Sequence, residues 1–407
     1  MRTVLFSLPC CLLAACADGG DEERPQSEVR FSATHHMFGF RALRGFGTFP
    51  VPATAVFTDR GTLNLFDDST YTVTRSTGTS GSERYALANE GDLSVYLTGF
   101  TRDGQREPSV VFQGGYGRVG ANDLITPGTT PDYFFTDRVS TPFSASLGLY
   151  VGTRIVTGSV ELEGAWHVLS LHTVFGASIL SPENVARGAR GGVSIAAGAA
   201  GTSRAISGTG TQGTSGLTFG GTIQNLLTNG SGDGTCNLTV NYTLTGQGAD
   251  SRVMQAVATD KLVLALDEDE SDNEAGLLFM VRKFDAPATP IDSVRVPGTF
   301  LCGGSTMFVN PSNSGSDAFV GAVTLGANGS FRLDAVGNDG DDFTYQGTYT
   351  LAQDGGMTIA ISGTNEQWFA AIDRSYNTFV FVDDFVETRA NNIPELNLGF
   401  CVREKAQ

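Results

Sequence analysis

Apolar and polar residues alternate with a period of two through most of this chain, which is the pattern of half-buried antiparallel strands. Residues 357–362 (MTIAIS) place one Met and two Ile on one face, and residues 331–334 and 396–400 alternate in the same way. Turn dipeptides such as Asn328-Gly329 and Asp354-Gly355 separate these segments at hairpin spacing. One short helix is expected at residues 181–184, where a proline follows a capping serine. The chain is therefore predicted to be nearly all β.

The alternating pattern recurs three times, and such a repeat determines the architecture. Each copy ends in a segment of small and apolar residues that closes on an arginine, at Arg154, Arg282 and Arg403. Upstream of each arginine, an aromatic or aliphatic run leads into an acid, at Asp137, Asp267 and Asp383. The unit is about 120 to 130 residues long, so three divergent copies account for the 407 residues.

The third copy contains eight short strands between residues 299 and 403. Eight sequential antiparallel strands favour a meander that closes into a small barrel, because closure removes exposed edges. A β-sandwich, or one larger structure in which the copies share strands, remains an alternative. We expect three consecutive β-meander modules at residues 31–158, 159–283 and 298–407, with a linker at 284–297 whose prolines oppose strand pairing.

The amino terminus has the features of an export signal. Met1 and Arg2 precede an apolar stretch that is too short to span a bilayer as a mature helix. It ends in the sequence LAAC at residues 13–16, which resembles the lipobox of bacterial lipoproteins. The resemblance implies that residues 1–15 are a signal peptide and that Cys16 carries a lipid, which anchors the mature chain to a membrane without spanning it.

The residues after the lipobox refine this localisation. Ala17 follows the cysteine, where an Asp would resemble an inner-membrane retention signal, so the outer membrane of the cell envelope is favoured. Residues 16–30 lack periodicity and are rich in Gly and acids. They are predicted to form a flexible tether.

Three cysteines of the mature body remain, and an oxidising compartment permits disulfides between them. Cys302 lies in the first strand of the third copy and Cys401 in the last. Because closure makes these strands neighbours, we predict a disulfide between Cys302 and Cys401; two buried thiols are the alternative. Cys236 is then interpreted as an inert buried thiol.

Charge and spacing argue against several ligand classes. The chain has 26 Lys plus Arg against 43 Asp plus Glu, so its net charge of −17 repels nucleic acid. His167 and His172 lie an odd number of positions apart, point to opposite faces of a strand and cannot share a metal. The acidic segments 267–274 and 338–342 do not match an EF-hand and are expected to cap solvent-facing hairpins. We therefore predict neither a metal site nor a cofactor.

The sequence contains no motif that assigns a catalytic residue. Neither a GxSxG elbow, an SxxK or HExxH motif nor a P-loop occurs in the sequence. Residues 343–349 (FTYQGTY) have a glycine and aromatic texture similar to that of the transferrin-binding-protein-like lipoproteins, but the glycine-and-acid motif of that family is absent, and none of its functions is carried over. We predict a non-catalytic binding module for a small apolar ligand or a protein partner. A structural envelope lipoprotein is the alternative, and a glycan-acting enzyme is less favoured.

Overall fold

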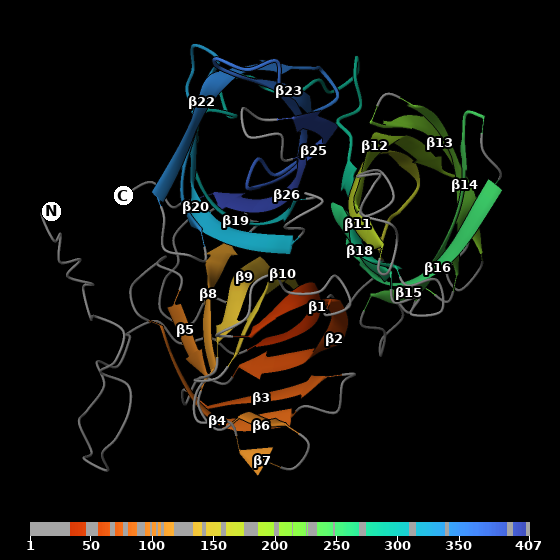
Figure 1. The fold of residues 1–407 in the computed structure, drawn as a ribbon. Coiled ribbons are helices and arrows are strands. Elements are labelled where there is room, and N and C mark those ends of the chain that lie inside the picture. The colour runs from red at the N-terminus through yellow and green to blue at the C-terminus, as the bar shows by residue number, and fades with distance from the viewer. Residues whose placement is uncertain are drawn as a thin grey trace, which may run out of the picture.

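The computed structural model is all β (Figure 1). It describes the strands between residues 33 and 155, and residues 160–403 apart from 175–185, 199–202, 214, 225, 227–233, 247–248, 268–273, 309–314, 338–341 and 389–393. Within these residues there are 26 strands and no helix. Cys16, the expected tether and the short helix expected at residues 181–184 lie outside the described residues.

The third module is a closed antiparallel barrel of eight strands in chain order. Its strands are β19 (Gly298–Phe308), β20 (Gly315–Leu325), β21 (Ser330–Gly337), β22 (Asp342–Leu351), β23 (Gly356–Ile361), β24 (Gln367–Ile372), β25 (Thr378–Thr388) and β26 (Pro394–Arg403). The predicted eight-stranded closed meander is confirmed. Burial alternates residue by residue in β22 and β23, so the period of two in the sequence reflects one core face and one outer face.

The second module is also a closed barrel of eight antiparallel strands in chain order. Its strands are β11 (Gly164–Val174), β12 (Ala186–Ile195), β13 (Arg204–Gln212), β14 (Ser215–Gln224), β15 (Thr235–Leu244), β16 (Ala249–Ala258), β17 (Leu262–Asp267) and β18 (Glu274–Arg282). Its first and last strands pair along their length, as β19 and β26 do in the third module.

The first module is a ten-stranded sheet. Its strands are β1 (Ala33–Gly45), β2 (Val56–Leu65), β3 (Thr70–Arg75), β4 (Ser80–Leu87), β5 (Ser94–Leu97), β6 (Phe100–Arg102), β7 (Gln105–Arg106), β8 (Val110–Gly117), β9 (Tyr133–Ser140) and β10 (Ser144–Arg154). The pairings lead from β1 through β2, β3, β4, β5, β8, β9 and β10 back to β1, and the β6–β7 hairpin branches from β4. This added hairpin distinguishes the first module from the other two.

The barrel interiors are filled by side chains of the barrels themselves. In the third barrel Trp368 stacks on Phe381 with 5.1 Å between ring centroids and meets Phe331 edge-on at 5.7 Å. Gly399 makes room for this packing, because a Cβ there would lie 2.2 Å from the Phe381 ring. The second barrel is filled mainly by aliphatic side chains around Trp166. Small barrels commonly have such packed interiors.

The recurrent arginine closes one end of each of these barrels. Arg403 donates hydrogen bonds to the carbonyl oxygens of Arg295, Val296, Pro297 and Tyr376 at 2.7–3.1 Å. Its guanidinium lies 4.3 Å from the centre of the Phe300 ring. Arg282 likewise bonds carbonyl oxygens before β11 and lies over Trp166, at 5.6 Å. In the second and third copies, the arginine that recurs in the sequence therefore donates hydrogen bonds to the backbone where the chain enters the barrel.

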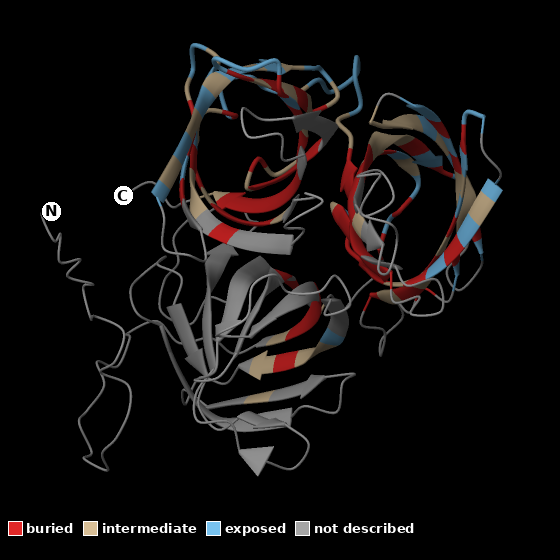
Figure 2. Ribbon diagram, in the orientation of Figure 1, coloured by how far each residue is buried: buried red, intermediate tan, exposed pale blue. Residues whose placement is uncertain are grey.

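The modules pack against one another (Figure 1). Strands β9 and β10 contact β19 and β20, β1 and β2 contact β17 and β18, and β11 and β12 contact β25. Phe279 of β18 and Phe400 of β26 stack between the second and third barrels, with 5.7 Å between ring centroids. All six residues of β17 are buried, which corrects the expectation of half-buried strands for this part of the chain. Figure 2 shows buried residues in red on β11 and β18, on the side of the second barrel that faces the third.

Cys302 and Cys401 are joined by a disulfide between the first and last strands of the third barrel. The two residues are directly opposite each other in the β19–β26 register. Both are fully buried, and Cys236 is a buried thiol in the second barrel. The disulfide therefore crosses the seam at which the third barrel closes.

Candidate functional site

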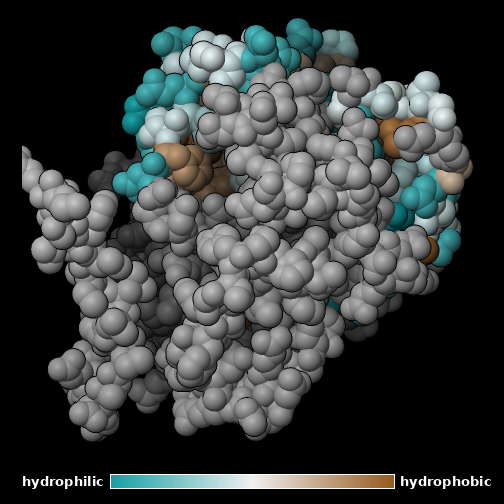
Figure 3. All heavy atoms as spheres, in the orientation of Figure 1, coloured by the Kyte–Doolittle hydropathy of each residue, from teal (hydrophilic) through white to brown (hydrophobic). Residues whose placement is uncertain are grey.

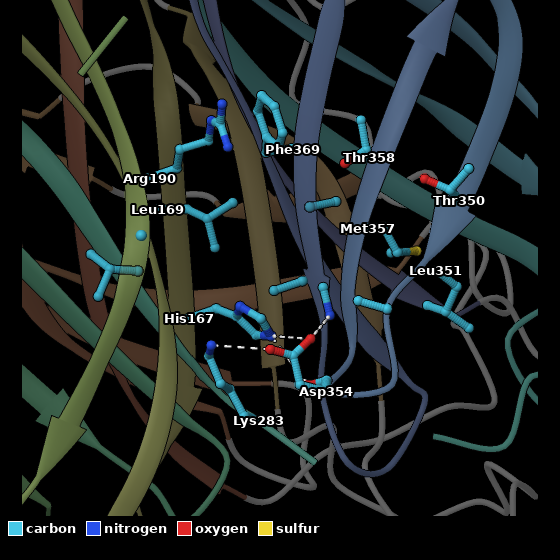
Figure 4. Close-up of a pocket in the computed structure, with 16 residues that line it drawn as sticks. His167, Leu169, Arg190, Lys283, Thr350, Leu351, Asp354, Met357, Thr358 and Phe369 are labelled. Carbon is cyan, nitrogen blue, oxygen red and sulfur yellow. Dashed lines mark hydrogen bonds and ion pairs between the residues drawn. The ribbon is translucent and has the colours of Figure 1, made fainter. Parts of the chain in front are cut away.

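A hollow of about 460 Å³ lies between the second and third barrels (Figure 4). One wall comes from β11, β12 and the residue after β18, and the other from the segment that runs from β22 to β24. Its volume is in the range of sites that hold small molecules. Because each barrel supplies one wall, the hollow exists only when both are folded and docked.

One end of the hollow is polar and is built around Asp354, in the turn between β22 and β23. Lys283 Nζ lies 3.0 Å from Asp354 Oδ2, and the Gly356 N–H donates to Oδ1 at 3.1 Å. Burial opposes ionisation of this carboxyl, but the electrostatic interactions with His167 and Lys283 and the Gly356 hydrogen bond outweigh it, so the pKa of Asp354 is lowered. Asp354 is therefore a carboxylate at neutral pH, and its contacts link the two barrels.

His167 stands beside this ion pair. Its Nε2 lies 3.1 Å from the carbonyl oxygen of Asp354 and 3.6 Å from Oδ1. Burial lowers the pKa of His167 to about 4, with a further contribution from the positive charge of Lys283 and an opposing one from Asp354. The imidazole is therefore neutral at pH 7.

The linker fixes Lys283 in place. Arg374 Nε donates to the Lys283 carbonyl oxygen at 2.6 Å, and Arg374 Nη2 forms an ion pair with Asp285, also at 2.6 Å. The Phe284 N–H donates to the Asp354 carbonyl oxygen at 3.0 Å. The start of the 284–297 segment is thus bonded to the third barrel, and Lys283 is held at the polar end of the hollow.

The rest of the lining is mixed, since Thr350 and Thr358 line it together with apolar side chains. Figure 4 shows the side chain of Leu169 on one side and those of Met357, Leu351 and Phe369 on the other. The Arg190 guanidinium carbon lies 2.9 Å from the centre of the Phe369 ring, which closes the far end with a cation over an aromatic face. The hollow can therefore take a ligand with an apolar body and a polar group at one end.

The other candidate residues lie elsewhere. His172 faces the opposite side of β11 from His167, as its spacing predicts, with Nδ1 3.4 Å from Asp267 Oδ2. Asp267 is fully buried and pairs with Arg252 at 2.9 Å, so this member of the acidic segment 267–274 does not face solvent as expected. The disulfide cysteines lie within the third barrel and not at the hollow.

The residues that gather at the hollow are far apart in sequence and belong to no motif. One signal was available, since Lys283 is one of only three lysines in the chain. His167 and Asp354 are separated by 187 positions, and only the docking of two barrels brings them together. Among the described residues, no group of three or more His, Cys, Asp or Glu side chains is arranged to hold a metal ion.

The described residues on the face in Figure 3 are mostly hydrophilic. The described turns at the top of the third barrel are hydrophilic, and hydrophobic residues emerge only in small patches. In the described part of the chain, no helix is long and apolar enough to cross a membrane.

Comparisons with known proteins give no family assignment. No family model and no curated protein matches the chain. Among solved structures it is similar to a protein of unknown function from the DUF3598 family of Nostoc punctiforme, at 11% identity and a TM-score of 0.21 over 60% of this chain and 96% of that chain.

Two further matches cover more of the chain. Intact Ap-TbpB, with its N and C lobes, matches at 9% identity and a TM-score of 0.22 over 92% of this chain and 78% of that chain. Isotype 1 transferrin binding protein B from serogroup B Neisseria meningitidis matches at 9% identity and a TM-score of 0.25, over 92% and 76%. At these values no activity is transferred.

Proposed function

We propose that this chain is an exported, lipid-anchored protein of the bacterial outer membrane that binds a small, mostly apolar ligand without catalysis. The hollow between the second and third barrels is the binding site. The observation that carries the proposal is the contrast between this open hollow, with its mixed polar and apolar lining, and the barrel interiors, which are packed with their own side chains. A ligand is therefore expected between the barrels and not inside them.

The charged groups of the hollow favour binding over catalysis. Asp354 is held as a carboxylate by Lys283 and the Gly356 N–H, and its lowered pKa makes it a poor general acid. His167 has a pKa of about 4 and is a weak base at neutral pH. These groups hold the two barrels together and give the site one polar end.

The membrane anchor is tested at Cys16. We expect wild-type protein to sediment with outer membranes and the Cys16→Ala variant to appear in the soluble fraction, because the variant has no thiol to receive the lipid. Membrane fractionation followed by immunoblotting measures the distribution. An unchanged membrane pool for Cys16→Ala would refute the anchor while leaving the binding site untouched.

The binding site is tested by filling it. Thr358 lies in β23 and lines the hollow, so Thr358→Trp places an indole where the ligand would sit. With anisole as a neutral apolar probe, we expect the variant to bind at least about tenfold more weakly than wild type in calorimetric titrations.

Thr348→Trp is the matched control for this experiment. Thr348 is exposed on neighbouring β22 and is not among the lining residues, so the same change there should leave anisole binding unaltered. Equal affinity for anisole in both variants and wild type, or no binding to wild type, would contradict the proposed function.

A further inference from the structure

The tautomer of His167 follows from its partners. Nε2 lies 3.1 Å from a backbone carbonyl oxygen and 3.6 Å from a carboxylate oxygen, both on Asp354. Both atoms only accept hydrogen bonds, so the proton of the neutral ring is on Nε2, which donates it to the carbonyl. Nδ1 therefore carries the unprotonated lone pair.

The orientation of the ring is fixed as well. Gly356 packs against the ring edge, and a Cβ at this glycine would lie 3.0 Å from His167 Cε1. Figure 4 shows Nε2 directed at Asp354 and the other ring nitrogen turned away from it, toward the hollow. Within the described residues, the polar contacts of the ring are those of Nε2 with Asp354. The hollow thus contains a hydrogen-bond acceptor at its polar end, beside the apolar surface of Leu169.

The surrounding charges limit what can approach this acceptor. Lys283 and Arg190 line the hollow and disfavour a cationic ligand. The Asp354 carboxylate lies 3.6 Å from the imidazole and disfavours an anionic group at the same point. The ring accepts only while it is neutral, and the pKa of about 4 keeps it neutral at physiological pH. A neutral donor, such as a hydroxyl or an amide N–H, is the complementary group.

We propose that His167 Nδ1 accepts a hydrogen bond from the ligand, so that the hollow selects a neutral molecule with an apolar body and one hydroxyl or N–H donor. This inference rests on the proposed function of the hollow. Leu169, which lies beside the imidazole on β11, gives the hollow an apolar surface that a ring could contact. A phenol-like molecule meets all of these requirements.

Phenol and anisole are the probes, because they share a ring and differ in whether the oxygen carries a donor. The measured quantity is the ratio of phenol affinity to anisole affinity, from titration calorimetry at pH 7 with the full chain. In His167→Phe we expect this ratio to fall about fivefold, the value of one neutral hydrogen bond in a partly buried site. His167→Asn can place an amide oxygen near the position of Nδ1 and should keep the wild-type ratio.

The outcomes separate this inference from the proposed function. If anisole binds and Thr358→Trp abolishes its binding, but the ratio is the same in wild type and His167→Phe, the donor preference is wrong and the pocket stands. A lowered ratio in His167→Asn with normal anisole binding also counts against it. If neither probe binds wild type, the function of the hollow itself fails. Thr348→Trp should behave as wild type with both probes.

Discussion

Replacing Arg403 with Met is expected to destabilise the third barrel by roughly 3 kcal/mol, because several carbonyl oxygens lose a charged hydrogen-bond donor at once. Arg403 donates hydrogen bonds to the carbonyl oxygen of Tyr376, in a turn, and to those of residues 295–297, just before β19. Methionine retains the aliphatic bulk over Phe300 but donates nothing. The carbonyl oxygens that accepted from Arg403 must then accept hydrogen bonds from water or stay unsatisfied.

The two tryptophans make the measurement specific to one barrel. Trp166 lies in the second barrel and Trp368 in the third, and both are fully buried. Trp166 is replaced by Phe, the residue type found at the equivalent position, Phe300, in the third barrel. In this background Trp368 fluorescence reports urea unfolding of the third barrel alone. Arg332→Met is the control, since the exposed Arg332–Asp334 pair should contribute less than about 1 kcal/mol. Equal losses of stability in the Arg403→Met and Arg332→Met variants would exclude the role of Arg403 in closing the end of the barrel.

Removing the Cys302–Cys401 disulfide is expected to have an effect of similar size. The two cysteines are 99 positions apart in sequence, and closing a loop of that length destabilises the unfolded chain by about 4.7 kcal/mol in the chain-entropy model. Reduction, or the double Cys302→Ala and Cys401→Ala variant, should therefore lower the urea midpoint of the third barrel, followed through Trp368.

The second barrel is the internal control for this experiment. It contains one cysteine, the buried Cys236, and no disulfide among its described residues. Its unfolding, followed through Trp166 in a Trp368→Phe background, should be the same before and after reduction. If the urea midpoint of the third barrel is the same before and after reduction, strand pairing alone closes the seam.

Much of the fold could be predicted from short-range pattern. In residues 357–362, the alternation marks a strand with one core face, and the structure shows that face in contact with Trp368 and its neighbours. Asp354-Gly355 marks a turn, and Gly355 has a positive φ of 92°, which glycine adopts without strain. The pairing of Cys302 with Cys401 follows from closure of the meander. These features depend on neighbours in sequence or on one topological rule.

The candidate site could not be predicted in this way. The pattern of residues 262–266, a continuous apolar run, is compatible with a strand buried on both faces, but it does not say what covers the second face. The covering element is another module, since β17 lies against β1 and β2. A different docking, that of the second barrel on the third, places His167 against Asp354 and creates the hollow.

The sequence by itself determined the all-β class, the threefold repeat, the eight-strand meander and the residues that close its seam. These depend on the period of the strand and on turn chemistry, both of which are local. Only the tertiary structure decided that Arg282 and Arg403 bond the backbone at the entrances of the second and third barrels, that the modules bury their strands against one another, and that a neutral histidine faces a hollow between two barrels. Contacts across 187 positions depend on how whole surfaces fit, and no local pattern encodes that fit.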